Sequence, residues 1–296
     1  METRRVIVPV ATLWTSPKAP RKIDQLALDG QTKQWVAQMT TAQTIDLCDA
    51  KRLETQAVFN DEVMIDSIAG EWAKVYLTTQ TDDADERGYI GWLPTKLLST
   101  APVTYSAEGP IVHITVPFTT LYDDQHQPQL DLVMGTALTK VAEEGHLLRV
   151  ATPFGDGYVA ADSTLVHADG ETAGDKMVAM AHQFLGLRYL WAGISPYGFD
   201  CSGFMYTLHR VLGIQIPRDA DDQRNSGQPV KPENLLPGDL LFFAYEHGKG
   251  FVHHVGMYIG NGQMIQSRTP GKQVDIAKLT EMRYAPEFVA ARRYWQ

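Results

Sequence analysis

The sequence predicts an α+β domain at the C-terminal end of the chain, preceded by two small all-β domains. Short β-rich motifs occur twice, in the same order, within residues 1–169. A Gly- and Thr-rich segment follows at 170–175, and beyond it the apolar residues take helical spacing. The length of 296 residues also exceeds the usual size of one domain. The predicted domains are therefore 1–100, 101–169 and 170–296.

The composition is that of an ordinary globular protein, with 44% hydrophobic and 21% charged residues. The formal net charge of −9 argues against nucleic acid as a partner and favours a small or neutral substrate. No apolar run is long enough to cross a bilayer, and Pro9 interrupts the apolar N-terminal stretch, so we expect no membrane partner and no export signal. Cys48 and Cys201 fall in different predicted domains and are expected to be free thiols in a reducing cytoplasm.

Three pairs of motifs form the internal repeat. They are VIVPVATLWTSP (6–17) with ITVPFTTLYDDQ (114–125), GEWAKVYL (70–77) with GHLLRVAT (145–152), and RGYIGWLPTKLL (87–98) with DGYVAADSTLV (156–166). Two copies of one small β domain would explain them, and chance similarity of β-rich sequence is the alternative. The pattern over residues 1–168 resembles the bacterial SH3-like barrel.

The first copy carries an insertion at about residues 20–51. Trp35, Val36 and Met39 stand at helical spacing there, which predicts one or two helices. Cys48, near the end of the insertion, is interpreted as a small apolar packing residue.

Cys201 lies in the segment SPYGFDCSGFMYTLHRVLG, which runs from Ser195 to Gly213. Apolar residues at 204, 208, 211 and 212 predict a helix, Asp200 is a good N-cap, and Gly213 suits the C-terminal end. Cys201 would then be the first helical residue, where the helix dipole lowers the pKa of a thiol. The local sequence leaves a reactive and a buried structural cysteine equally open.

A thiolate nucleophile needs a base, and two adjacent histidines lie downstream. LLFF, FVHHVGMYIG and QMIQS (240–267) predict three strands, the last two joined by a tight GNG turn. Neighbouring strand residues face opposite sides, so His253 and His254 cannot share one cleft. Gly256 would leave room on the cleft side of His254, which favours His254 as the base.

Four motifs in this order carry a specific resemblance: FLGLRYLWAGISPYGFDCSGF, IPRDADDQ, LLPGDLLFF and HHVGMYIGNGQMI. Over about residues 175–290 the chain resembles the NlpC-type cysteine peptidases, which cut bacterial cell-wall peptides and have a papain-like α+β fold. The resemblance implies Cys201 as nucleophile and His254 as base. It places Gln266 at the third catalytic position, where its oxygen can accept the Nδ1–H of the imidazole but carries no charge. Ala192 departs from the family pattern W-G-G, and we expect its methyl group to be tolerated.

The resemblance implies acyl transfer through a thioester. Backbone N–H groups near the helix start, including that of Cys201, would hold the oxyanion, with the Tyr189 hydroxyl as a further donor. A half-buried structural aromatic is the alternative for Tyr189. No metal or other cofactor is expected, because neither CxxC nor HExxH occurs.

The domain order resembles the intracellular γ-D-glutamyl-L-diamino acid endopeptidases, which recycle murein-derived peptides beginning with a free L-Ala. A free amine calls for carboxylates in the cleft. Near the thiol the candidates are Asp200, Ser202 and Asp219, although Ala220 stands where the family has serine. By the resemblance, the first β domain would contribute Glu54 and Tyr89, and a solvated surface charge is the alternative for Glu54.

Other functions stay open at this point. A general peptidoglycan hydrolase would use the β domains to bind intact cell wall, and a non-catalytic peptide-binding adaptor would keep only the fold. An acyltransferase could use the same thioester chemistry. The sequence does not decide between L-Lys and diaminopimelate at the third stem position, or the oligomeric state.

Overall fold

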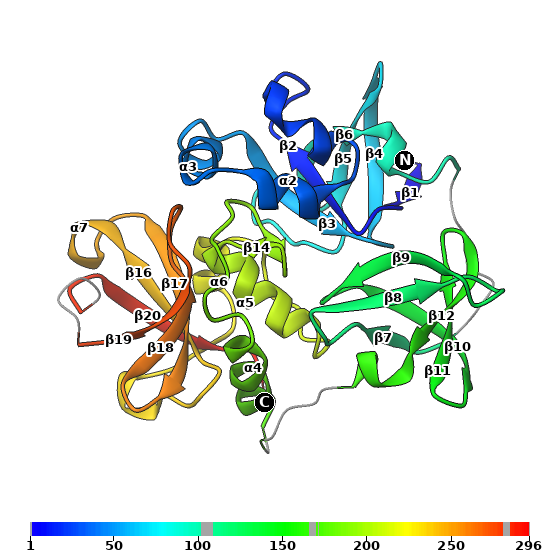
Figure 1. The fold of residues 1–296 in the computed structure, drawn as a ribbon. Helices are drawn as coiled ribbons and strands as arrows, with labels where there is room; N and C mark the ends of the chain where they lie inside the picture. Colours follow the sequence, from blue (N-terminus) through cyan, green and yellow to red (C-terminus); the bar gives the residue numbers. More distant parts are fainter. Residues whose placement is uncertain (1, 102–108, 166–169, 171, 281–284, 296) are drawn as a thin grey trace. The chain divides into compact units, whose positions relative to one another are not determined.

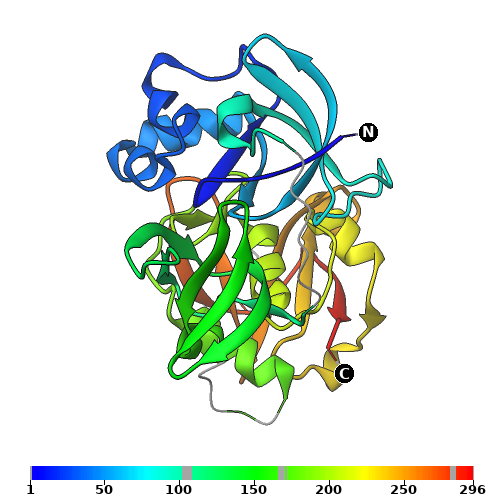
Figure 2. The same ribbon diagram turned by 90° about the vertical axis from the view of Figure 1, so that its right-hand side faces the viewer.

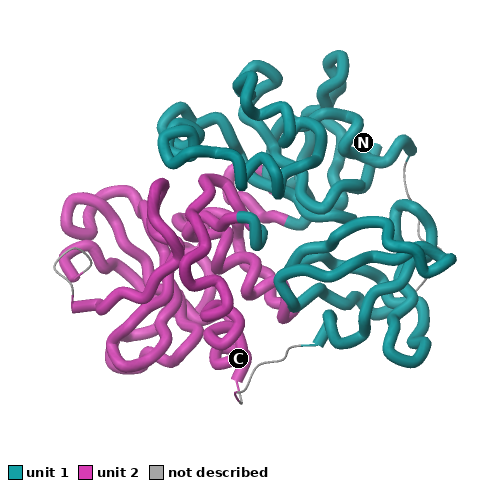
Figure 3. The backbone as a smooth tube through the Cα atoms, in the orientation of Figure 1, with its two compact units in different colours: residues 1–79, 87–166, 195–197 teal, residues 80–86, 167–194, 198–296 magenta. Residues whose placement is uncertain are grey.

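The computed structural model describes residues 2–101, 109–165, 170, 172–280 and 285–295. The chain divides into two compact units, shown in separate colours in Figure 3. The first comprises residues 1–79, 87–166 and 195–197, and the second comprises 80–86, 167–194 and 198–296. The sequence boundary expected at residue 169 lies outside the described residues. Within the described ranges, no helix is long and apolar enough to cross a membrane.

The first unit contains two antiparallel sheets of six described strands each, and the two sheets have the same strand order (Figure 1). The order in the first sheet is β1-β4-β5-β6-β2-β3. Its strands are β1 (Thr3–Arg5), β2 (Val10–Trp14), β3 (Leu53–Val58), β4 (Glu62–Ala69), β5 (Trp72–Leu77) and β6 (Tyr89–Pro94), followed by the 3₁₀ helix η2 (Thr95–Leu97).

The second sheet, green in Figure 2, repeats this order as β7-β10-β11-β12-β8-β9. Its strands are β7 (Ile111–His113), β8 (Phe118–Tyr122), β9 (Pro128–Val133), β10 (Ala137–Glu144), β11 (Leu147–Thr152) and β12 (Gly155–Ala160), followed by η3 (Ala161–Thr164). The β4–β5 ladder has a bulge between Ile65 and Ser67, and the β10–β11 ladder has one between Lys140 and Ala142. The matching strand order and bulges support the internal repeat.

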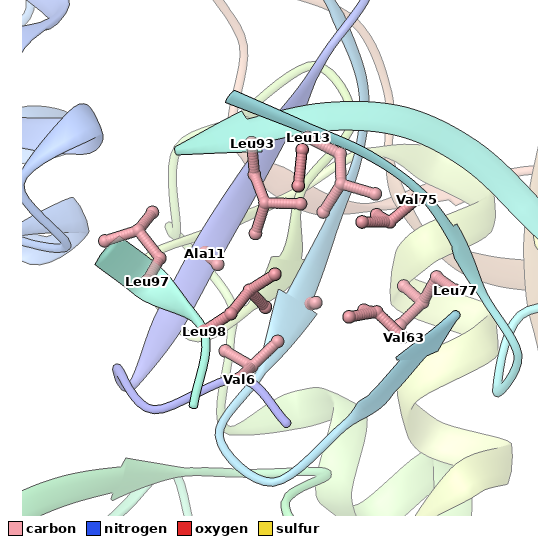
Figure 4. Close-up of a cluster of buried hydrophobic side chains, with 11 residues drawn as sticks. Val6, Ala11, Leu13, Val63, Val75, Leu77, Leu93, Leu97 and Leu98 are labelled. Carbon is pink, nitrogen blue, oxygen red and sulfur yellow. The ribbon is translucent and has the colours of Figure 1, made fainter. Parts of the chain in front are cut away.

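Each sheet encloses its own apolar core. The first core contains Leu13, Val75 and Leu93, which point toward one another in Figure 4. The second core contains Leu121 and Val150 at the matching motif positions. Phe59, which follows the last residue of β3, is fully buried in this second core, so the first β domain contributes a side chain to the second.

A hydrogen bond adds to this connection, because the Asn60 side-chain amide donates to the Ala137 carbonyl at 2.8 Å. Phe59 and Asn60 therefore join the two sheets into one unit.

The insertion between β2 and β3 has more helices than expected. It contains η1 (Lys22–Asp24), α1 (Gln25–Leu28), α2 (Thr32–Gln38) and α3 (Thr41–Asp49), so the prediction of one or two helices was wrong. Thr40 and Gln43 form a capping box that starts α3 separately from α2. Trp35 is buried, and its indole N–H donates to Asp24 at 2.8 Å. Cys48 lies in α3 and is half-buried.

The second unit is built on one antiparallel sheet with the order β15-β20-β16-β17-β18-β19. Its strands are β15 (Gln228–Pro229), β16 (Leu240–Ala244), β17 (Val252–Gly260), β18 (Gln263–Ser267), β19 (Val274–Lys278) and β20 (Phe288–Arg293). The other elements are α4 (Ala173–His182), the two-stranded sheet of β13 (Ile194–Ser195) and β14 (Gly198–Phe199), α5 (Cys201–Arg210), α6 (Ala220–Asn225), η4 (Pro232–Asn234) and α7 (Tyr245–Gly248). The predicted strands β16, β17 and β18 are all present.

Helix α5 contacts β17 and β18 and ends as predicted. The N–H of Ile214 donates to the His209 carbonyl and that of Gly213 to the Arg210 carbonyl, with φ of Gly213 at +71°. This is the glycine-terminated helix end that the sequence indicates. Helix α4 ends at His182, and the N–H of Gly186, four residues further on, donates to the Val274 carbonyl at 3.0 Å.

A loop of the first sheet belongs to the second unit. Residues 80–86 connect β5 to β6 yet group with the C-terminal part of the chain. The Arg218 N–H donates to the Thr81 carbonyl at 3.1 Å, and the Asp83 N–H donates to the Asp222 carboxylate at 3.2 Å. The second unit is therefore not one continuous stretch of sequence.

Candidate active site

Asp200 starts helix α5 and makes Cys201 its first residue, as predicted. The Asp200 backbone is extended, and its Oδ1 accepts the N–H of Gly203 at 2.6 Å. This bond satisfies one of the N–H groups left open at a helix start. The Ser267 hydroxyl donates to the Phe199 carbonyl at 2.7 Å, so β18 holds the segment directly before the thiol.

Gly203 allows the loop before the thiol to pack closely against the helix. A Cβ on Gly203 would lie 2.2 Å from the Gly193 carbonyl oxygen, which no side chain could tolerate. The Asp200 N–H donates to that same carbonyl at 3.1 Å. Ala192 has φ of +65°, in the left-handed region that favours glycine. The methyl group is thus tolerated, as expected, although the backbone takes a conformation that is strained for a residue other than glycine.

His254 lies on β17 and is buried, with 3% of its surface exposed. Its Nε2 is 2.6 Å from Oε1 of Gln266 on β18. The prediction that Gln266 orients this imidazole agrees with the contact, but the prediction that it accepts Nδ1–H was wrong. Since the amide oxygen can only accept, Nε2 carries the proton and Nδ1 is the nitrogen that can act as the base.

Gly256 leaves room beside the neighbouring strand β18. A Cβ at Gly256 would lie 2.9 Å from the Met264 sulfur and 3.5 Å from Cβ of Gln266. The space that glycine leaves thus lies on the side of β18, beside the Met264 sulfur. The neighbouring His253 faces elsewhere, as strand alternation predicts: its Nε2 is 3.3 Å from the Glu287 carboxylate, and its ring stacks on Tyr245.

The thiol of Cys201 does not have the lowered pKa that the helix start predicts. Burial raises the pKa of this thiol to about 12, and the nearby Asp200 carboxylate adds to the rise. Hydrogen bonds from the backbone N–H groups of Val255 and Ser202, and the charge of Arg218, act in the opposite direction without overcoming burial. Cys201 as a residue is half-buried. The thiolate therefore has to form by proton transfer to a base.

The Cys201 thiol lies beside the residue that follows His254 in the chain. This residue is Val255 on β17, and its backbone N–H bonds the thiol. The candidate nucleophile thus contacts the strand that carries the candidate base.

Arg218 is a functional candidate that the sequence reasoning missed. It is 1% exposed, and its guanidinium donates to both carboxylate oxygens of Asp200, at 2.7 and 3.2 Å, and to the Ser202 hydroxyl at 3.0 Å. Asp200 and Ser202, predicted as substrate-binding, are therefore both bound by one buried cation. An arginine directly after Ile216 and Pro217 is a sequence signal that could have indicated a buried ion pair.

The other predicted residues occupy three settings. Tyr189 is buried and bridges to Phe199, two residues before the thiol. Asp219 is half-exposed, is the N-cap residue of α6, and stands 3.9 Å from the Arg218 guanidinium. Glu54 on β3 and Tyr89 on β6 belong to the other unit and are half-buried, with Tyr89 packed against the core of its own sheet.

A second residue missed from the sequence is Asp275, on β19. It pairs directly with Gln266 across the ladder, and its Oδ1 accepts the Gln266 amide N–H at 2.8 Å. The alternating pattern VDIAK is the signal that could have indicated a strand here, and it does not indicate that Asp275 pairs with Gln266.

The sequence profile of the NlpC/P60 family matches residues 186–293. The gamma-D-glutamyl-L-lysine dipeptidyl-peptidase of Bacillus subtilis (strain 168) is 38% identical over 291 residues, 97% of each chain. The Bacillus cereus (strain ATCC 10987 / NRS 248) protein of the same name is 38% identical over 97% of this chain and 89% of its own.

The agreement extends to the three-dimensional fold. The crystal structure of an NlpC/P60 family protein from Bacillus cereus ATCC 10987 matches with a TM-score of 0.89 and 35% identity, over 99% of this chain and 100% of that one. The C-terminal domain is thus preceded by two antiparallel β-sheet domains, in the order that the sequence predicts. With full-length relatives of this similarity and a matching C-terminal profile, the chain belongs to the NlpC/P60 family.

Proposed function

We propose that this protein is a cysteine endopeptidase that hydrolyses the bond between γ-D-Glu and an L-diamino acid in murein peptides with a free N-terminal L-Ala. One observation carries the chemistry. Cys201 opens a helix beside Val255, and the adjacent His254 holds its imidazole through Nε2 against Gln266. The substrate follows from full-length similarity to two dipeptidyl-peptidases named for γ-D-glutamyl-L-lysine.

The reaction runs in two halves. In acylation, Cys201 passes its proton to Nδ1 of His254 while the sulfur attacks the γ-carbonyl carbon of D-Glu. The oxyanion is held by backbone N–H groups at the start of α5, with the Tyr189 hydroxyl as a further donor. Nδ1–H then protonates the departing amine of the diamino acid, which leaves a thioester. In deacylation, His254 takes a proton from water, the hydroxide adds to the thioester, and L-Ala-γ-D-Glu leaves with the thiol restored.

Recognition of the free amine is assigned to carboxylates, with Glu54 and Tyr89 as the residues that the resemblance implies. Asp200, Ser202 and Asp219 are the candidates beside the thiol. Arg218 binds both oxygens of Asp200, so the negative charge of this carboxylate is already largely compensated. This favours Glu54 as the carboxylate that discriminates a free from a blocked amine.

The first experiment follows L-Ala-γ-D-Glu-L-Lys, its diaminopimelate counterpart and their N-acetylated forms by mass spectrometry. We expect release of L-Ala-γ-D-Glu from the free peptides alone, and no product with Cys201→Ala. Equal cleavage of free and acetylated peptides would instead indicate a general wall hydrolase. No cleavage of any peptide would favour an adaptor or an acyltransferase.

The amine-reading residues are tested separately. A hydrogen bond to a charged group contributes about 1.5–3 kcal/mol, so Glu54→Gln and Tyr89→Phe should each lower kcat/KM for the free peptide by about tenfold to a hundredfold. Glu71→Gln, an exposed carboxylate of the same unit, is the matched control and should change nothing. Equal effects at all three positions would remove Glu54 and Tyr89 from the site.

We further propose that the two β-sheet domains are SH3-like barrels and that the enzyme recycles cell-wall peptides in the cytoplasm. The repeated strand order supports a common domain type. Cleavage of peptides with a free N-terminus in preference to intact sacculi would agree with recycling. Release of peptides from sacculi would contradict it.

A further inference from the structure

We propose that Asp275 is a positioning residue of the active site, which acts through Gln266 to select the tautomer of His254 that can serve as a base. The inference rests on the proposed cysteine-peptidase chemistry and adds a fourth residue to it. Nothing in the sequence motifs indicates this role, because Asp275 lies outside all of them. The juxtaposition comes from the register of β18 and β19, which places Asp275 directly opposite Gln266.

The first step concerns the glutamine. A Gln side chain has an acceptor oxygen at one end and a donor NH₂ at the other, and its two orientations differ little in shape. The Gln266 side chain is fully buried. Its Nε2 donates to Oδ1 of Asp275 at 2.8 Å, and its Oε1 lies 2.6 Å from Nε2 of His254. A carboxylate oxygen accepts and does not donate, so Asp275 binds only the NH₂ end.

The second step concerns the imidazole. With the NH₂ end of Gln266 held by Asp275, the oxygen must face His254, and this contact is a hydrogen bond only if Nε2 of His254 carries hydrogen. In the neutral ring Nδ1 is then unprotonated and able to accept the thiol proton. If the amide turned over, its NH₂ group would face His254 and favour a proton on Nδ1. That tautomer cannot accept a proton from Cys201 through Nδ1.

The same chain of contacts acts after proton transfer. His254 then carries a positive charge, and Nε2–H still donates to the Gln266 oxygen. The Asp275 carboxylate polarises the amide from its far end, which strengthens the acceptor. A neutral residue at the third position is thereby coupled to a carboxylate without a direct contact between Asp275 and the imidazole.

Three variants and one control test the proposal. Asp275→Ala removes the acceptor, whereas Asp275→Asn can still present an oxygen to the Gln266 NH₂ group. Gln266→Met removes the amide and is combined with Asp275→Ala in a double-mutant cycle. Lys278→Ala, an exposed residue of the same strand, is the matched control.

The first readout needs no peptide substrate. Alkylation by iodoacetamide is followed over pH, with Cys201 and Cys48 quantified separately by peptide mapping. For Asp275→Ala we expect alkylation of Cys201 near pH 7 to slow by about tenfold to a hundredfold, by analogy with the loss when a partner that orients a metal-binding histidine is removed. The rate at Cys48, which lies in the other unit, should be unchanged and serves as the internal control. Asp275→Asn should recover most of the loss.

Two further readouts separate positioning from general destabilisation. The ¹⁵N spectrum of the imidazole should show hydrogen on Nε2 of His254 in the parent and a shift toward the Nδ1–H tautomer in Asp275→Ala, with His254→Ala used for assignment. Cleavage of L-Ala-γ-D-Glu-L-Lys should lose kcat with little change in KM.

The outcomes decide the proposal whether or not that peptide is cleaved. Asp275→Ala with a parental tautomer and a parental alkylation profile would overturn it. So would additive effects of Asp275→Ala and Gln266→Met, because a residue acting through Gln266 has nothing to position once the amide is gone. If the parent fails to cleave the peptide while the tautomer and alkylation results hold, the proposed substrate is wrong and the role of Asp275 stands.

Discussion

The buried His209 should make this protein lose stability in mild acid. His209 lies in helix α5, eight residues after Cys201, and is fully buried. Its Nδ1 donates to the Met205 carbonyl at 2.7 Å, and its ring packs edge-on against Tyr294. Burial lowers the pKa of this imidazole from 6.5 to about 4, because the charged form is not solvated there.

The sign and size follow from proton linkage. Above pH 6.5 the imidazole is neutral in both the folded and the unfolded chain and contributes nothing. As pH falls from 6.5 toward 4, the unfolded chain binds the proton that the folded chain refuses, so stability is lost. At pH 5 this difference amounts to about 2 kcal/mol, and it approaches about 3 kcal/mol below pH 4.

The assay is urea unfolding at pH 7.5 and pH 5, followed by far-UV circular dichroism and tryptophan fluorescence. His209→Phe removes the titrating group, so between these two pH values it should lose about 2 kcal/mol less stability than the parent. His182→Phe is the matched control: it makes the same contact to the carbonyl four residues earlier, but it is exposed. A His209→Phe variant that loses as much stability as the parent would refute the reasoning.

Three further predictions use the same unfolding measurement. Ala192→Gly should raise stability by about 0.5–1 kcal/mol, since relief of the left-handed strain exceeds the entropy that glycine adds to the unfolded chain; a lower stability would contradict the strain argument. Arg218→Met should cost about 3–5 kcal/mol because it leaves Asp200 buried without its cation, and adding Asp200→Asn should recover part of the loss. Burial and nearby acidic residues raise the pKa of Asp222 from 3.8 to about 6, so the contribution of this group to stability grows as pH falls through 6 and partly offsets the loss caused by His209. Asp222→Asn removes this contribution and should lose more stability than the parent between pH 7.5 and pH 5; an equal loss would contradict the argument.

The parts of the site that the sequence predicts well are those set by local bonds. Asp200 caps α5 through a residue three positions on, and Gly213 ends the helix through carbonyls a few residues back, so both signals lie within one short segment. The capping box of Thr40 and Gln43 is an equally local signal, and it predicts that α3 starts separately from α2.

The predictions that failed concern features that depend on segments distant in the sequence. The helix start at Cys201 is local, but burial of the thiol depends on everything packed around it, and burial determines the direction of its pKa shift. Which imidazole nitrogen meets Gln266 depends on how β17 and β18 pair. Asp275 entered the site only through the register of β18 with β19, for which a single sequence gives no signal.

The loop of residues 80–86 bears on whether the C-terminal domain of this enzyme could be produced as a separate fragment. A recombinant fragment beginning at residue 170 would contain the thiol, the histidine and the whole C-terminal sheet. It would nevertheless lack the Thr81 carbonyl that accepts the Arg218 N–H and the Asp83 N–H that binds Asp222. Arg218 in turn binds the carboxylate that caps the helix of Cys201. The C-terminal domain of this protein, produced alone, would therefore lack contacts that hold Arg218 and Asp222. Exchanging the β domains between two relatives would also exchange the residues that make these contacts.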